Sequence, residues 1–186
     1  MRQTRALPNG WWGMAVFMAS EAALFGSLIG TYFYLEFTAR QWPLGGIAAP
    51  SVALPLVLTA ALVATSVPLI LATRAARRGR TRATWLFVFS ALVVQAAYLA
   101  IQIAEYRSDL ETFKPSANAY GSIYFTLLGA HHIHVIVGLL LSLWLLARLL
   151  GGLTDYRVKA VRAIALYWYV VNAIAVFVVA TQVSPS

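Results

Sequence analysis

Glu21 is the residue whose type and position point most directly to chemistry. It lies about ten residues inside an almost entirely apolar run from Trp11 to Phe37. An uncompensated carboxylate in lipid is costly, so residues of this kind are paired or protonated and commonly mark functional sites. Two interpretations stay open: a group that transfers protons or contacts lipid, and a structural acid whose hydrogen bond to a neighbouring helix contributes about 1 kcal/mol. In both, we expect Glu21 to be substantially protonated at neutral pH.

Three histidines lie within four residues, at His131, His132 and His134. Imidazole is a common ligand of metals and haem iron, so the cluster suggests such a site. A helix turns by about 100° per residue, which places His131 and His134 about 60° apart and turns His132 about 160° from His134. At most one pair can therefore share an ion. Because the chain has no cysteine and no second histidine cluster, we favour structural hydrogen bonding over metal ligation.

Two further signals are weaker. Glu105, followed by Tyr106, stands where the third apolar run ends, and a carboxylate near the membrane interface is expected as part of a solvated helix end. Ala22, Gly26 and Gly30 form a small-residue stripe in the first run. Stripes of this kind let helices approach closely in membranes, so we interpret these three residues as a helix-packing surface.

The elements that position these residues must lie in a membrane. Apolar residues make up 61% of the chain, charged residues 11%, and the mean hydropathy is +0.75. That composition leaves too little polar surface to cover a soluble globule. The absence of cysteine excludes disulfides, thiolate metal sites and a cysteine nucleophile.

Five apolar runs are each long enough to cross a hydrocarbon core of about 30 Å. Since lipid offers no partners for free backbone groups, we expect an all-α integral membrane bundle. It forms one domain over residues 11–182, between short tails at 1–10 and 183–186. Pro68 should bend the second span, with Thr65 or Ser66 helping to satisfy the freed carbonyl. The predicted spans are Trp11 to Phe37, Leu54 to Thr73, Ala83 to Ile103, Gly121 to Leu149 and Ala160 to Thr181.

The distribution of cations predicts the orientation. Eleven of the fourteen Lys and Arg residues fall on one side of the predicted bundle, and positive-inside bias places that side, with the N-terminus, in the cytoplasm and the C-terminus outside. The net charge of +8 does not favour nucleic-acid binding, because these cations lie in short loops beside anionic lipid headgroups. The eleven are Arg2, Arg5, Arg74, Arg77, Arg78, Arg80, Arg82, Arg148, Arg157, Lys159 and Arg162.

Several segments, in their order and spacing, resemble subunit III of the haem-copper respiratory oxidases, in the five-helix bacterial form. The resemblance covers almost the whole chain. The matching segments are Trp12-Gly13-Met14 with Ser20-Glu21, Glu105-Tyr106, Tyr120-Gly121-Ser122, Gly129 to Gly138, Arg148 and Tyr167-Trp168.

The resemblance implies an accessory subunit of the bacterial inner membrane that has no catalytic residues, metal or cofactor of its own. Its partner, the catalytic subunit I, would hold haem and copper, reduce oxygen and pump protons. The family role is to hold phospholipids in a cleft and to support proton uptake by that partner. By the same resemblance, Glu21, His131 and His134 match polar family positions inside the membrane, and Arg148 matches a basic position that would meet a lipid phosphate.

The chain departs from the family pattern in its fifth span. Tyr169 and Asn172 stand where the family usually has histidine and aspartate, and Arg162 replaces a glutamate. Two other classes of protein also stay open. One is a haem- or metal-binding membrane protein that uses His131 and His134. The other is a small transporter, which is less favoured because polar residues are sparse in the second and fifth spans.

Overall fold

The computed structural model describes residues 9–47 and 52–183. Regular structure in this part of the chain is entirely helical, and five helices are long and apolar enough to span a membrane when α2 and α3 are taken as one interrupted span. The predicted all-α fold is therefore confirmed. Residues 1–8 and 184–186 of the predicted tails lie outside the described residues. The elements are α1 (Asn9–Thr38), the short 3-10 helix η1 (Leu44–Gly46), α2 (Ala53–Ala64), α3 (Ser66–Arg77), α4 (Thr81–Thr112), α5 (Ala119–Leu149) and α6 (Asp155–Val183).

The helices extend beyond several of the predicted span boundaries. The third was expected to end at Ile103, but α4 continues to Thr112, and α6 begins at Asp155 rather than at Ala160. Hydropathy marks where a helix leaves the apolar part of the membrane, whereas the helix itself continues as long as its residues favour helical structure. The extra turns carry charged residues such as Arg107 and Glu111 above the apolar segment.

The second span is interrupted at Thr65, three residues before Pro68. Pro68 has no backbone N–H and cannot bond to the carbonyl four residues earlier, which weakens the helix at this point. Thr65 responds with two bonds to the Leu62 carbonyl, one from its backbone N at 3.1 Å and one from its hydroxyl at 2.6 Å. The sequence predicted a bend near Pro68, and the helix is interrupted there. The Thr65 hydroxyl bonds to the Leu62 carbonyl, however, and not to the Ala64 carbonyl that Pro68 leaves without its usual N–H donor.

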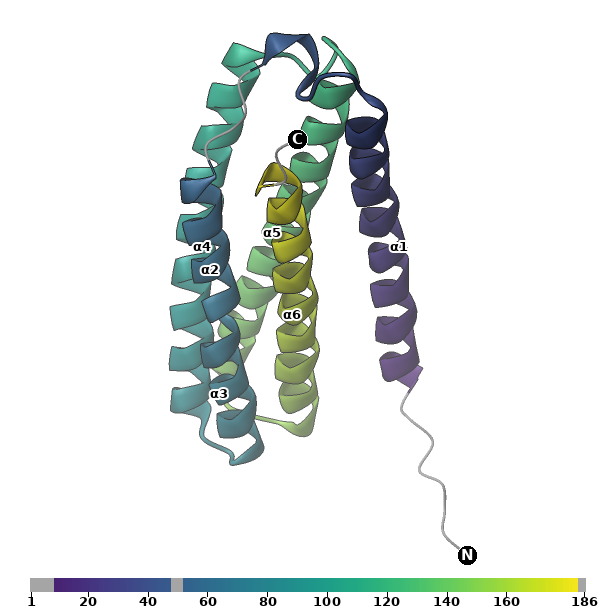
Figure 1. The fold of residues 1–186 in the computed structure, drawn as a ribbon. Coiled ribbons are helices and arrows are strands. Elements are labelled where there is room, and N and C mark those ends of the chain that lie inside the picture. Colours follow the sequence, from purple (N-terminus) through teal and green to yellow (C-terminus); the bar gives the residue numbers. More distant parts are fainter. Residues whose placement is uncertain (1–8, 48–51, 184–186) are drawn as a thin grey trace, which may run out of the picture.

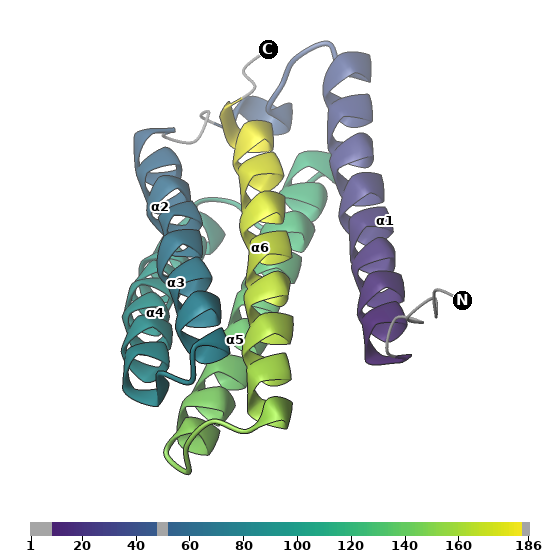
Figure 2. The same cartoon turned by 90° about the horizontal axis from the view of Figure 1, so that it is seen from below.

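Helices α2 to α6 form the main bundle, and α1 stands at its edge (Figures 1 and 2). The α3 and α4 helices pack together, α5 packs on α4 and α6, and α1 contacts mainly α5 and α6. In its most apolar segment only 11% of α1 is buried, against 56% for α6. The first helix therefore leaves most of its surface to lipid or to other chains.

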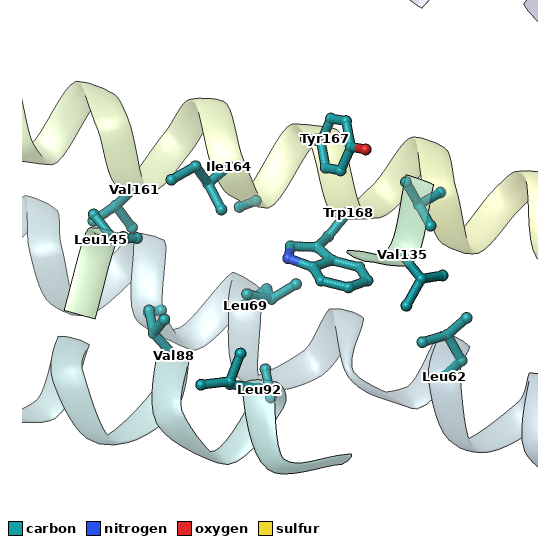
Figure 3. Packing of buried hydrophobic residues seen from close by; sticks show 14 of the residues in the cluster. Leu62, Leu69, Val88, Leu92, Val135, Leu145, Val161, Ile164, Tyr167 and Trp168 are labelled. Atoms are coloured by element: carbon teal, nitrogen blue, oxygen red, sulfur yellow. The ribbon is translucent and has the colours of Figure 1, made fainter. Parts of the chain in front are cut away.

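The core is centred on Trp168, which is completely buried in a cluster of residues from helices α2 to α6 (Figure 3). Its indole N–H donates to the Ser142 hydroxyl at 2.9 Å, and its ring lies directly against Gly138 of α5. A Cβ atom at Gly138 would lie 2.6 Å from Trp168 Cζ2. Only glycine therefore lets α5 and α6 approach this closely.

Basic and acidic residues are distributed unequally between the two ends of the bundle. The α3–α4 turn, the α5–α6 loop and the first residues of α1 lie together at one end in Figure 1. We call this the basic end, because Arg77, Arg80, Arg148 and Arg157 lie there. The opposite end holds the α4–α5 connection and the last residues of α6, and we call it the acidic end because Glu105, Asp109 and Glu111 lie there. The placement of the basic end in the cytoplasm stays a prediction.

Candidate functional site: a glutamate–histidine pair between α1 and α5

Glu21 and His134 form a direct pair that joins α1 to α5. The Glu21 Oε2 and His134 Nε2 atoms are 2.6 Å apart, and the two side chains are 16% and 17% exposed. One turn after Glu21, Phe25 is buried and meets the His134 ring edge-on, with ring centroids 5.2 Å apart. The pair therefore lies at the flank of the bundle, partly covered by α1 and partly open to whatever adjoins that helix.

The hydrogen bonds of His134 determine how many protons the pair holds. The His134 Nδ1 atom lies 2.7 Å from the Ala130 carbonyl oxygen, which can only accept, so Nδ1 must carry a hydrogen. The contact between Nε2 and Glu21 then holds one proton, either as a neutral carboxyl and imidazole or as a carboxylate and imidazolium. Both forms have no net charge, which is the condition that an apolar membrane favours.

A third helix, α6, bonds to the backbone at His134. The Tyr167 hydroxyl of α6 donates to the backbone carbonyl of His134 at 2.8 Å. Its ring stacks on Phe17 of α1, with centroids 6.3 Å apart. Tyr167 on α6 thus contacts both α1 and α5, the two helices that carry the pair.

His131 and His134 serve different partners, although both were expected on one face of their helix. The His131 ring is 2% exposed and its Nε2 lies 3.1 Å from the Tyr98 hydroxyl of α4. His132 is also buried and meets the Tyr106 ring edge-on. Over the described ranges, no three His, Cys, Asp or Glu side chains converge as a metal-binding group. The histidines instead connect α5 to α1 on one side and to α4 on the other.

Arg148 and Glu105 lie at opposite ends of the bundle. Arg148 is exposed in the last turn of α5, at the basic end. Glu105 is half-buried and lines a small pocket at the acidic end together with Asp109 and Gln182. Glu105 therefore belongs to a polar pocket, and it is less solvated than the helix end that the sequence predicted.

The small-residue stripe of α1 faces away from the other helices of the chain. Ala22, Gly26 and Gly30 are exposed, and a Cβ atom at either glycine would meet nothing within 4 Å. No helix in the described part of the chain packs on this stripe. That a helix of another polypeptide packs on this stripe stays a prediction.

Sequence reasoning missed the partners on α4. Tyr98 links to His131, Gln102 donates to the Tyr98 hydroxyl at 3.2 Å, and the Tyr124 hydroxyl donates to Asp109 at 2.6 Å. The signal that could have found them is the spacing of the polar residues on α4, at steps of three and four, which places them on one helical face.

Comparison with known proteins places these features in a family context. Residues 2–183 match the family model described as cytochrome c oxidase subunit III. Subunit 3 of the cytochrome bo(3) ubiquinol oxidase from Pseudomonas aeruginosa is 29% identical, over 89% of this chain and 80% of that protein. Cytochrome c oxidase subunit 3 from Alkalihalophilus pseudofirmus is 28% identical, over 95% and 87% respectively.

A longer relative is named differently. The haem-copper oxidase subunit I+III of Aeropyrum pernix is 29% identical over 87% of this chain, but the matched region is only 21% of that protein. Its name combines two subunits in one polypeptide.

Proposed function

Because the chain belongs to the cytochrome c oxidase subunit III family, we propose that it is an accessory subunit that packs on the catalytic subunit I, retains phospholipid and supports proton uptake. The five apolar helices and the bacterial subunit 3 relatives make it a multi-pass protein of the bacterial inner membrane. The A. pernix relative, whose name joins subunits I and III, supports subunit I as the partner. Haem and copper would belong to the partner subunits, and oxygen would be reduced there.

The observation that carries this proposal is the Glu21–His134 pair. It holds one proton within a unit of no net charge, at the flank of a membrane bundle, and both side chains stay partly exposed. Such a unit can pass a proton on, releasing one toward a neighbouring group as it takes up another, and it then keeps zero net charge in lipid. A partner subunit or a lipid headgroup that lies beside α1 could contact this pair.

The apolar flank of α1 supports the lipid part of the proposal. Val16 and Phe17 are exposed on this helix, and Arg148 is exposed in the last turn of α5. Acyl chains would lie along the first surface, and Arg148 would pair with a phosphate at the basic end. In the same proposal the basic end lies in the cytoplasm, and residues 11–182 act as a single membrane domain.

Sustained turnover of the assembled oxidase tests the proposal. Glu21→Gln keeps the size of the side chain and removes the acid, so we expect a normal initial rate of oxygen consumption that declines severalfold faster during continuous turnover. Glu111→Gln, the same change at an exposed position of α4, is the matched control and should keep the original time course. A Glu21→Gln enzyme with an unchanged time course would reject the role in proton uptake.

A haem- or metal-binding protein is the second function to be weighed against this one. Its expected ligands are already engaged: His131 Nε2 with Tyr98, and His134 with both Glu21 and the Ala130 carbonyl. A shared ion would have to break these bonds and bring two rings together that now face different helices. The geometry therefore favours hydrogen bonding at both histidines.

A further inference from the structure

Five polar residues form a stripe on the face of α4 that points into the bundle. Steps of three and four residues separate them, which keeps them on one helical face over about four turns. Gln95 is fully buried, Tyr98 and Gln102 are 3% and 9% exposed, and the last two residues are half-buried at the acidic end. The stripe, in chain order, is Gln95, Tyr98, Gln102, Glu105 and Asp109.

A pocket opens at the acidic end of this stripe. It has a volume of about 70 Å³, and Gln102, Glu105 and Asp109 line it together with Gln182 from α6. One water needs roughly 10–15 Å³ of volume counted in this way, so the pocket has room for several molecules. Its carboxylates and amides supply the two to four polar partners that an ordered water requires.

Hydrogen bonds continue from the pocket into the bundle. Gln102 lines the pocket and donates to the Tyr98 hydroxyl, and that hydroxyl lies 3.1 Å from His131 Nε2. The chain of contacts therefore runs from the acidic end to a histidine that is 2% exposed. Gln102 and Tyr98 lie one helical turn apart on α4, and His131 lies beside Tyr98 on α5.

His131 leaves this chain of bonds incomplete. Its Nδ1 atom is buried and has no hydrogen-bond partner among the described residues. If Tyr98 donates to Nε2, then Nδ1 carries an N–H without an acceptor; if Nε2 donates, then Nδ1 is an acceptor without a donor. An unpaired buried polar group is costly, so both tautomers call for a further hydrogen-bond partner.

We propose that water enters the bundle from the acidic end through this pocket and reaches His131 along Gln102 and Tyr98. Water can donate to Nδ1 or accept from it, so it satisfies the imidazole in both tautomers. The proposal goes beyond the accessory role of the Glu21–His134 pair, because the inlet opens at a different place and leads to a different histidine. If the stripe serves only to bind helices together, His131 will instead be dry.

Water contact can be measured first in the unaltered chain, where folding is not in question. The full chain, with ¹⁵N-labelled histidine, is placed in lipid nanodiscs, and magnetisation transfer from water to each ring is followed by solid-state NMR. Only three histidines contribute signals, and single His→Gln variants assign them. We expect rapid transfer from water to the His131 ring. Transfer no faster than to buried leucine methyl groups, followed in a second sample labelled with ¹³C-leucine, would overturn the proposal.

The absence of cysteine allows a second, independent test of the route. Gln102→Cys and Leu99→Cys place single thiols on neighbouring turns of α4, at positions that are both 9% exposed. The probe is Ag⁺, which is small enough for the pocket, and protection of the thiol is read by later labelling with a maleimide in denaturant.

Because the thiolate is the reactive species and ionises readily only where water is present, we expect protection at Gln102→Cys to be at least about tenfold faster than at Leu99→Cys. Both variants remove a large side chain, so the cavity that each creates is matched, and helix content by circular dichroism verifies folding. Equal rates at the two positions would show that the stripe does not conduct water.

Discussion

The Glu21 carboxyl group lies 2.6 Å from the His134 imidazole, although 113 positions separate the two residues in the chain. The pair is the only contact between acidic and basic side chains within 4.0 Å over residues 9–47 and 52–183. Since Nδ1 of His134 faces a carbonyl, one proton is left for the contact between the two residues. This shared proton makes an acid tolerable at the flank of the bundle.

The position of that proton can be observed by infrared spectroscopy. Separating two charges in a poorly solvated site is costly, so we expect the neutral form, with a protonated Glu21 and a neutral His134, to dominate at pH 7. The difference spectrum between the unaltered chain and Glu21→Gln should then contain the C=O band of a protonated carboxyl group. The bands of an ordinary ionised carboxylate in its place would count against this assignment.

The contact between Gly138 and Trp168 predicts a stability effect. In Gly138→Ala the new Cβ would lie 2.6 Å from the indole ring, and overpacking of this kind typically costs about 1–3 kcal/mol. Gly30→Ala adds the same methyl group to α1, where nothing lies within 4 Å. Unfolding in mixed micelles should therefore show destabilisation in the first variant only. Similar losses in both would mean that Trp168 does not set the helix spacing.

The outward stripe of α1 predicts an interface with another subunit. Gly26→Leu adds a large side chain where the chain itself leaves open space, so the isolated subunit should keep its stability. Close packing of a neighbouring helix would be blocked, and we expect less of the catalytic subunit to copurify. The control is Ala97→Leu at an exposed position of α4. Undiminished copurification with Gly26→Leu would leave the stripe as a lipid-facing surface.

Lipid retention at the basic end can be tested through Arg148. Its guanidinium is exposed in the last turn of α5, and pairing with a phosphate would hold an anionic lipid there. In native mass spectrometry, Arg148→Ala should carry less bound anionic lipid than the unaltered complex. Arg82→Ala, another exposed arginine at the same end, should retain it. An identical lipid complement in the three samples would reject the assignment of Arg148.

The sequence predicts the membrane fold well because the bilayer imposes simple rules of length and hydropathy. Glu21 also stands out, since an acid in an apolar run is unusual. Its pairing with His134 could not be predicted, because the level at which α1 and α5 meet depends on loops, tilt and packing. Periodicity predicted that His131 and His134 share one face of their helix. In the structure His131 contacts Tyr98 of α4, whereas His134 contacts Glu21 of α1.

The small-residue stripe of α1 shows a second limit of prediction from the sequence. The spacing of Ala22, Gly26 and Gly30 predicts a surface for close helix approach, but a single sequence does not reveal which polypeptide supplies the other helix. The structure leaves the stripe exposed within the chain. The polar face of α4, in contrast, could have been predicted from the steps of three and four residues that connect Glu105 to Tyr98.

Purification of the tagged chain from native membranes, with an optical spectrum and identification of the copurifying subunits, tests the central claim most directly. We expect haem absorbance and a catalytic haem-copper subunit in the native preparation, and a colourless, metal-free protein when the same chain is produced alone in a host without its partners. Haem or stoichiometric metal bound to the solitary chain, and lost in His131→Ala or His134→Ala, would contradict the assignment of an accessory subunit.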